Sequence, residues 1–124
     1  MSEIYHRDES YKIIGCCFEV HKTLGVGFLE AVYKDALELE FINHGLPFAR
    51  EVEFLVTYKG ELLRHRYYAD FTAYDKIIVE VKSTKDFNDV FIAKCINYLK
   101  VSGYKLAILV NFGTAEMQFK RVVL

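Results

Sequence analysis

The chain has 124 residues and a net charge of −1, from 16 Lys and Arg against 17 Asp and Glu, so no global electrostatic field draws it to nucleic acid. Hydrophobic residues make up 52% of it and aromatic residues 15%, which excludes disorder and suits one domain over residues 1–124. The polar N-terminus and the lack of an apolar run of roughly 18 residues predict no signal peptide and no membrane span, and we expect a cytoplasmic protein.

Apolar residues at helical spacing predict a first helix over residues 8–24, ended by Gly25. Its predicted inner face consists of Tyr11, Ile14, Cys17, Phe18 and His21. A second helix is predicted over residues 28–44, ended by Gly45. Its predicted inner face consists of Leu29, Val32, Tyr33, Ala36, Leu37 and Phe41.

From Phe48 onward the apolar pattern changes to a period of two, which predicts strands over residues 50–58, 61–74 and 76–83. A third helix follows, with Asp86 or Asn88 as its N-cap and Gly103 as its end.

The C-terminal part of the sequence predicts two more strands. Residues 105–112 form a fully apolar strand typical of one buried on both faces, and residues 117–124 form an edge strand. The order ααβββαββ indicates an α/β domain with a mixed central sheet flanked by helices.

Three cysteines are present, two of them adjacent. Cys16, Cys17 and Cys95 fit neither a disulfide framework nor zinc-ligand spacing. We interpret them as reduced residues that pack in the core.

The segment ADFTAYDKIIVEVKS places two acids and a lysine inside predicted strands. If its turn centres on Asp75, Asp70 lies directly opposite Glu80, with Cβ atoms roughly 4.5–5.5 Å apart. In the same register Tyr68 lies opposite Lys82. The other face of this hairpin is predicted to be core and consists of Ala69, Phe71, Ile77, Val79 and Val81.

Two facing carboxylates repel each other, and a divalent cation reverses the sign of that interaction. Lys82, beside the pair, is placed to stabilise charge developing on a substrate or to orient a water. The pattern therefore suits metal-assisted hydrolysis of a phosphodiester. A solvated strand face with mixed charges explains it equally well. On the repulsion argument, Asp70→Asn should leave the metal-free protein at least as stable as the parent.

Upstream, GVGFLEAVY spaces Gly27, Glu30 and Tyr33 as G-x-x-E-x-x-Y. Glu30 and Tyr33, three residues apart, meet on one face of the predicted helix. Both also have purely structural explanations, since an acid in the first turn gains from the helix dipole and a tyrosine packs in a core.

Over nearly its whole length the sequence resembles the GxxExxY protein family, a bacterial group within the PD-(D/E)XK nuclease superfamily. The resemblance rests on the segments EVHKTLGVGFLEAVYKDALELE, YYADFTAYDKIIVEVKS, INYLKVSG and LAILVNFG. It implies a restriction-endonuclease-like core that uses Mg²⁺ or Mn²⁺.

The resemblance also implies roles for individual residues. Asp70 and Glu80 would bind the metal. Glu30 and the main-chain carbonyl of Val81 would be further ligands. Lys82 would be the catalytic lysine.

Four more residues would support the site or contact substrate: His21, Tyr33, Lys94 and Tyr98. His21 matches the histidine of the EVH segment, and its place on an apolar helix face favours a structural role. Lys94 stands where relatives carry Gln, four residues before a tyrosine. A lysine there is able to pair with the acids when metal is absent, or to contact phosphate as a point charge.

The leading hypothesis is a metal-dependent nuclease acting on single- or double-stranded DNA. The alternative is a non-catalytic protein-interaction module that retains the nuclease fold, and a third option is a hydrolase of small phosphoesters. A binding module predicts an exposed apolar patch, whereas a nuclease predicts a basic groove beside the acids. Candidates for that groove are Arg64, Arg66, Lys85 and Lys94. The oligomeric state is left open, a homodimer included.

Overall fold

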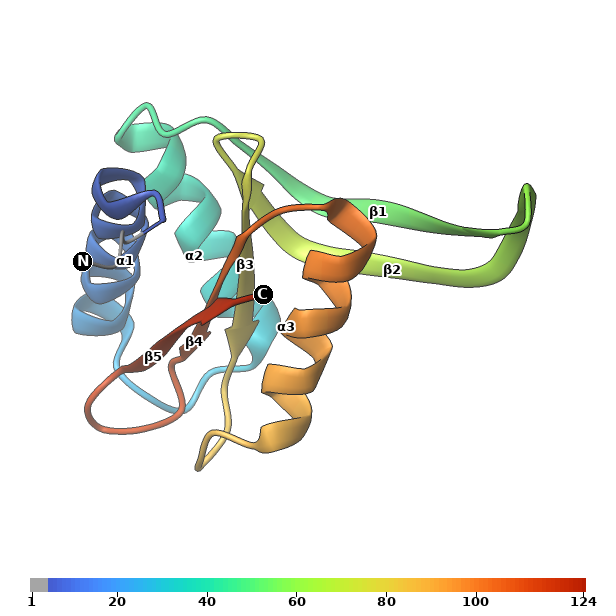
Figure 1. Ribbon diagram of the computed structural model, residues 1–124. Coiled ribbons are helices and arrows are strands. Elements are labelled where there is room, and N and C mark those ends of the chain that lie inside the picture. Colours follow the sequence, from blue (N-terminus) through green and yellow to red (C-terminus); the bar gives the residue numbers. More distant parts are fainter. Residues whose placement is uncertain (1–4) are drawn as a thin grey trace, which may run out of the picture.

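The computed structural model describes residues 5–124, and within them the chain forms three helices and a five-stranded mixed sheet. The elements are α1 (Arg7–Leu24), α2 (Glu30–Asn43), β1 (Phe48–Tyr58), β2 (Glu61–Ala73), β3 (Ile77–Lys82), α3 (Asp89–Ser102), β4 (Leu106–Asn111) and β5 (Gln118–Val123). The predicted order ααβββαββ and the α/β fold class are confirmed (Figure 1). None of the three helices has the length and apolar character needed to cross a lipid bilayer.

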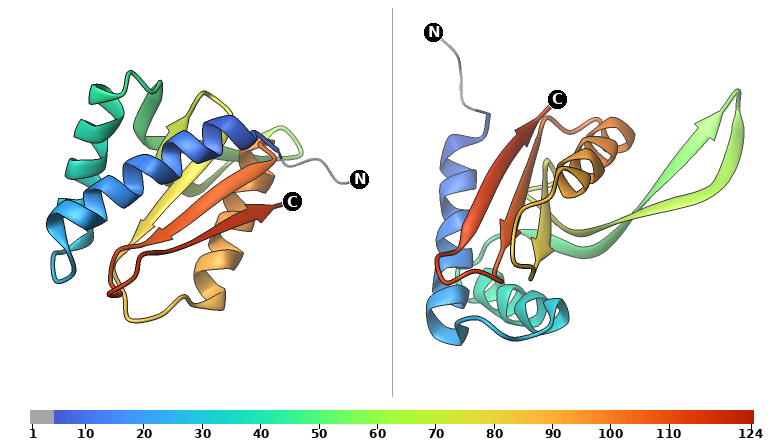
Figure 2. Two further views of the ribbon diagram at one scale, coloured as in Figure 1. Left: turned by 90° about the vertical axis from the view of Figure 1, so that its left-hand side faces the viewer. Right: turned by 90° about the horizontal axis from the view of Figure 1, so that it is seen from below.

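The strands lie in the order β1-β2-β3-β4-β5. Only β3 and β4 are parallel, and α3 connects them in the way that parallel neighbours require. Helices α1 and α2 lie on one side of the sheet and α3 lies on the other (Figure 2). All six residues of β4 are buried, as its apolar sequence predicts for a strand covered on both faces.

Two buried clusters fill the spaces between these layers. The larger lies between the sheet and helices α1 and α2 and includes Phe71 and Val79, and the smaller lies under α3 and includes Ala69 and Ile78. Placing Ala69 on the same core face as Phe71 was therefore wrong. The chain turns over between these two residues, at Asp70.

The buried face of α1 differs in part from the prediction, because Cys17 is buried and Ile14 packs against the core as expected, whereas two aromatic residues do not. Tyr11 is 81% exposed and Phe18 is 48% exposed, while Ile13, Cys16 and Val20 are buried. Both sets have helical spacing, so periodicity alone does not separate them, and the contact with the sheet and α2 selects the narrower side chains. In the segment 28–44, Leu29 is exposed and precedes the helix, and Val32 is also exposed, although the other predicted inner positions are buried or half-buried.

The helix signals in the second half of the sequence are confirmed. The side chain of Asn88 accepts a hydrogen bond from the main-chain N–H of Val90 at 2.8 Å, which caps the start of α3. Gly103 ends the helix in the left-handed conformation.

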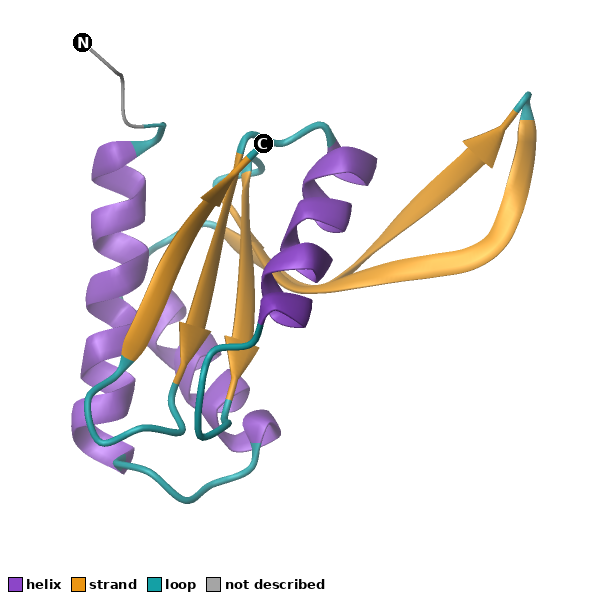
Figure 3. Cartoon of the chain, turned by 60° about the horizontal axis from the view of Figure 1, so that its bottom comes forward, coloured by secondary structure: helices purple, strands orange, loops and turns teal. Residues whose placement is uncertain are grey.

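Strand β2 pairs with β3 only over the last three residues of β2. Its ladder with β3 covers only Phe71–Val79, Thr72–Ile78 and Ala73–Ile77, in the predicted register. Beyond that point β2 pairs with β1 alone, and the two continue as a ribbon that projects from the domain (Figures 1 and 3). We call residues 52–69 the β1–β2 arm. At its base Glu51 has a φ of 54°, an uncommon conformation for a residue with a side chain.

A buried amide fixes the loop that follows Lys82. Asn111 is fully buried, and its Oδ1 accepts hydrogen bonds from the main-chain N–H groups of Thr84 (2.9 Å) and Gly113 (3.0 Å). Its Nδ2 donates to Thr84 O (3.0 Å) and Gln118 Oε1 (3.1 Å). All the polar capacity of this side chain is thus used to hold two loops together.

The same contact explains a glycine. A Cβ atom on Gly113 would lie 2.2 Å from the carbonyl oxygen of Thr84, so the two loops would have to separate. We expect Gly113→Ala to lower the free energy of unfolding by about 2–3 kcal/mol, measured by urea denaturation. Gly15 in α1 is the control, because a Cβ there meets nothing within 4 Å. Gly15→Ala should raise stability by about 0.5–1 kcal/mol, and equal effects at the two sites would refute the packing argument.

Candidate active site

Asp70 and Glu80 lie side by side where β2 separates from β3. Oδ2 of Asp70 accepts a hydrogen bond from the main-chain N–H of Val81 at 2.8 Å, and the N–H of Asp70 donates to Oε1 of Glu80 at 3.3 Å. The two acids therefore meet through reciprocal contacts with the neighbouring main chain rather than as a ladder pair. The predicted pairing of Tyr68 with Lys82 is wrong, because Tyr68 already belongs to the arm and pairs with Glu53.

The two acids titrate in opposite directions. Burial raises the pKa of Glu80 well above its ordinary value, and the negative charge of Asp70 adds to the shift. Burial also acts to raise the pKa of Asp70, but hydrogen bonds from Glu80, the Val81 N–H and Lys34 outweigh it and lower that pKa. Of the two carboxyl groups, Glu80 therefore keeps its proton to the higher pH. Where Glu80 is protonated, the repulsion expected from the sequence is absent.

A lysine that the sequence analysis missed completes the neutralisation. Nζ of Lys34, on α2, lies 3.0 Å from Oδ1 of Asp70 and also contacts the carboxylate of Glu51. Lys34 and Asp70 are mostly shielded from solvent, whereas Glu51 is half exposed. The one available signal was that Lys34 follows Glu30 by four residues and so lies on the same helix face.

Glu30 is the first residue of α2 and is half-buried. Among residues 5–124, no three His, Cys, Asp or Glu side chains lie close enough to hold a metal ion. The structure brings together two of the three predicted acids and does not bring Glu30 into a metal-binding group with them.

Lys82 and Lys94 both approach aromatic side chains on the α3 side of the sheet. Nζ of Lys82 lies 4.7 Å from the ring centroid of Phe91, and Nζ of Lys94 lies 5.8 Å from that of Tyr98. Neither lysine forms an ion pair within the described part of the chain. Lys94 is near enough to Glu80 to favour its ionised form.

Tyr98 forms a hydrogen bond between α3 and the base of the arm. Its hydroxyl donates a hydrogen bond to the main-chain carbonyl of Tyr68 at 2.8 Å, and burial raises its pKa. Of the other candidate cations, Arg64 and Arg66 lie on the arm and Lys85 lies in the β3–α3 loop.

The remaining predicted residues, Tyr33 and His21, make structural contacts around the ring of Phe112. Tyr33 is fully buried, donates to the carbonyl of Gly25 at 2.6 Å and stacks on Phe112 with ring centroids 4.7 Å apart. His21 stacks on the same ring, and its Nε2 lies 2.9 Å from the carbonyl oxygen of Thr114. The structural role predicted for His21 agrees with these contacts, and the core explanation of Tyr33 also holds.

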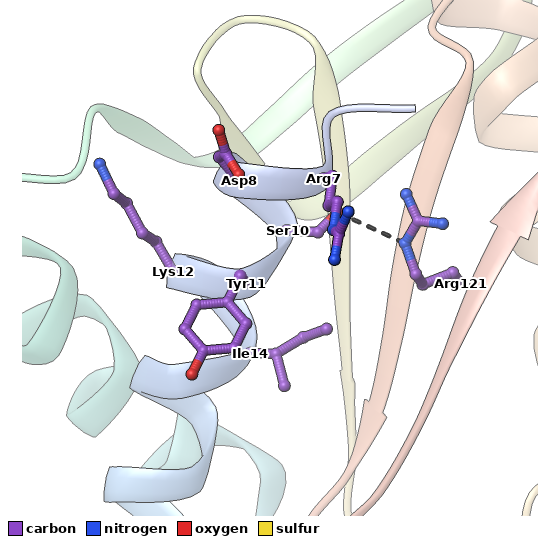
Figure 4. A pocket seen from close by; sticks show the side chains of 7 residues that line it. All are labelled: Arg7, Asp8, Ser10, Tyr11, Lys12, Ile14 and Arg121. Atoms are coloured by element: carbon purple, nitrogen blue, oxygen red, sulfur yellow. Dashed lines mark hydrogen bonds between the residues drawn. The ribbon is translucent and has the colours of Figure 1, made fainter. Parts of the chain in front are cut away.

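A pocket of about 670 Å³ lies elsewhere, between α1 and β5 (Figure 4). Its lining includes Arg7, Lys12 and Arg121, and Nε of Arg121 donates to Ser10 Oγ at 3.4 Å. It contains none of the predicted site residues.

The raised pKa of Glu80 predicts a pH dependence. The folded-state pKa of Glu80 lies above its ordinary value of 4.5. The contribution of protonated Glu80 to the free energy of unfolding is therefore complete below about pH 4.5 and is lost as the pH rises through the raised pKa. We expect Glu80→Gln to remove that loss, so that in EDTA its unfolding free energy falls less than the parent's between about pH 5 and about pH 8. Urea denaturation across this range measures it. Glu61→Gln on the exposed arm should keep the parent's slope, and an unchanged slope in Glu80→Gln would show that Glu80 is ionised in the fold.

The contacts of Asp70 reverse the stability expected from the sequence. Asp70→Asn removes the charge that faces Lys34 and weakens the acceptor for the Val81 N–H. We therefore expect a loss of about 1–3 kcal/mol in EDTA, measured by thermal and urea denaturation. Glu51→Gln removes the exposed partner of the same lysine and should cost less than about 1 kcal/mol. An Asp70→Asn variant as stable as the parent would restore the repulsion argument.

Comparisons with known proteins agree with this architecture. None of the curated proteins matches the chain. Among solved structures, the protein described as "Crystal structure of SSO0001" is similar with a TM-score of 0.61 and 18% identity, over 75% of this chain and 48% of that one. The match covers about half the length of that protein and shows the fold alone. A family model described as "PD-(D/E)XK nuclease superfamily" matches residues 7–122. This chain, with its paired acids beside a lysine on a mixed sheet, belongs to the PD-(D/E)XK nuclease superfamily.

Proposed function

We propose that this protein is a Mg²⁺- or Mn²⁺-dependent nuclease that hydrolyses DNA phosphodiester bonds. The observation that carries the proposal is the buried contact of Asp70 with Glu80, two residues from Lys82 on the same strand. A buried acid pair costs stability unless it is compensated, and retention of such a pair is typical of a functional site. Within the superfamily, we propose that the chain belongs to the GxxExxY group of bacterial, cytoplasmic proteins.

The donor atoms of the pair fit a small divalent cation. Mg²⁺ prefers carboxylate and carbonyl oxygens and keeps several of its waters, so two carboxylates and the carbonyl of Val81 provide enough protein ligands. Such an ion, when bound, supplies positive charge beside the scissile phosphate and lowers the pKa of a bound water. The chain must adjust to hold it, because Glu80 has to lose its proton and Lys34 has to give up Asp70.

The lysines have separate roles in this proposal. Lys82 points to the α3 side, as Glu80 does, and its ammonium group stabilises charge that develops on the phosphate or orients the attacking water. Lys94 contacts phosphate as a point charge, in place of the amide that relatives carry. Lys34 keeps the metal-free site neutral.

That neutralisation is also what favours the alternative function. With a proton on Glu80, whose pKa is raised, and Lys34 beside Asp70, the acid pair would be satisfied without any metal, as a non-catalytic interaction module would require. The assay that separates the two functions is incubation of the purified protein with single- and double-stranded DNA in Mn²⁺, Mg²⁺ or EDTA. Cleavage that EDTA abolishes supports the nuclease, and absence of cleavage with either metal supports the module.

Lys82 tests the chemistry separately from metal binding. Because Lys82 is not a metal ligand in the proposed site, Lys82→Ala should bind Mn²⁺ as the parent does in calorimetry and lose activity by about 100-fold or more. Lys120→Ala, on the exposed edge strand β5, is the control and should keep the parent's activity. Loss of metal binding in Lys82→Ala would overturn the role assigned to this lysine.

A further inference from the structure

The β1–β2 arm is a two-stranded ribbon that lacks a covering layer over its outer half. Near its base Phe54 and Tyr67 pack against the cluster under α3. Further out, Leu55, Tyr58 and Leu62 are 49%, 60% and 50% exposed. An isolated ribbon of two strands is only marginally stable in water, so an arm of this length is expected to have a binding partner.

The face of the arm that points away from α3 is built from alternate residues of β2. Leu62, Arg66 and Tyr68 pair with alternate residues of β1 and lie on the face opposite Tyr67, and Arg64 lies between Leu62 and Arg66 where the register of the two strands shifts. Tyr68 is 50% exposed and Arg64 is exposed. This row ends two residues before Asp70, so it leads directly to the candidate active site.

The charge of the arm is opposite in sign to that of the whole chain. It carries Lys59, Arg64 and Arg66 against Glu53 and Glu61, whereas the chain as a whole has a net charge of −1. Arg66 pairs with Glu53 at 3.2 Å, while Lys59 and Arg64 form no ion pair within residues 5–124. Two unpaired cations therefore stand on the outer part of the arm.

We propose that the arm holds a nucleic-acid duplex, with the ribbon lying in the major groove and Lys59 and Arg64 against the phosphates. The major groove of B-DNA admits a two-stranded ribbon, and tyrosine and arginine on one face suit contacts with bases and phosphates. Arg64 lies six residues from Asp70, roughly 20 Å along an extended strand, which is less than one turn of duplex. This inference rests on the proposed function, for which it supplies the surface that holds the substrate.

The charges also favour nucleic acid over a second copy of the chain. Interface cores between proteins are depleted of charged residues, whereas two of the four residues Leu62, Arg64, Arg66 and Tyr68 are cations. A DNA duplex carries far more negative charge than a second copy of the chain, whose net charge is −1, so the unpaired cations of the arm are attracted more strongly to the duplex.

Binding can be measured without cleavage. In EDTA, fluorescence anisotropy with a labelled DNA duplex compares the parent, the double variant Lys59→Gln/Arg64→Gln and the control Lys105→Gln/Lys120→Gln. Both doubles remove two positive charges, and the control lysines are exposed and lie at β4 and β5. The arm variant should bind about tenfold more weakly than the parent and show a salt slope smaller by about 1.8, while the control stays within about twofold.

Two results would overturn the proposal. Equal weakening in both double variants would show that net charge alone matters. A parent that sediments as a dimer, and an arm variant that sediments as a monomer with unchanged duplex affinity, would show that the arm binds a second copy.

A small substrate separates this inference from the nuclease proposal. Hydrolysis of bis(p-nitrophenyl) phosphate with Mn²⁺ needs the acid pair and Lys82 but no arm, so the arm variant should match the parent. If the parent binds duplex through the arm and fails to hydrolyse this diester, the arm stands and the nuclease proposal fails. If the parent hydrolyses it and the arm variant keeps full duplex affinity, the nuclease proposal stands and the arm proposal fails.

Discussion

The contact between Asp70 and Glu80 depends on one constraint, the separation of β2 from β3 at Asp70. In a regular antiparallel ladder, the main-chain groups of Asp70 and Val81 would form hydrogen bonds with the main chain of the opposite strand. Because the ladder stops one residue earlier, the N–H of Val81 is free to donate to the Asp70 carboxylate, and the N–H of Asp70 donates to Glu80. The same break lets β2 turn over, so that Phe71 faces α2 and Ala69 faces α3. The acid pair, the change of face and the arm are three results of one irregularity.

The break also explains how a buried acid pair is tolerated. Glu80 is 3% exposed, and an isolated charge at that depth would cost several kcal/mol. The raised pKa of Glu80 favours its uncharged form, and Lys34 compensates the charge of Asp70. Lys34 contacts both Asp70 and Glu51, and Glu51 has its left-handed conformation where the β1–β2 ladder skips these two acids. The strained residue, the lysine and the acid pair form one connected unit.

Most of the fold was predictable because local signals were strong where no long-range choice was involved. The change of period at Phe48, the cap at Asn88 and the apolar strand ending at Asn111 each determine an element from neighbouring residues. The buried face of α1 was only partly predictable, since Cys17 was placed correctly but Tyr11 and Phe18 were not, and only packing against the sheet selects between the apolar positions of the helix. Lys34 was missed for a related reason. Its two partners, Glu51 and Asp70, lie at a break in the β1–β2 ladder that no glycine marks, because the positive φ falls on Glu51.

The candidate site was therefore found from sequence through its acids and not through what supports them. In the segment G-x-x-E-x-x-Y, the hydroxyl of Tyr33 donates a hydrogen bond to the carbonyl of Gly25, and its ring stacks on Phe112. The tyrosine therefore stabilises the turn that leads into α2. Ser83, directly after Lys82, donates to the carbonyl of Phe28 in that same turn at 3.0 Å. The turn thus joins the strand that carries Glu80 and Lys82 to the start of α2, the helix that carries Glu30 and Lys34. A pattern that looks catalytic in the sequence acts in the structure as the link between the two elements from which the site is built.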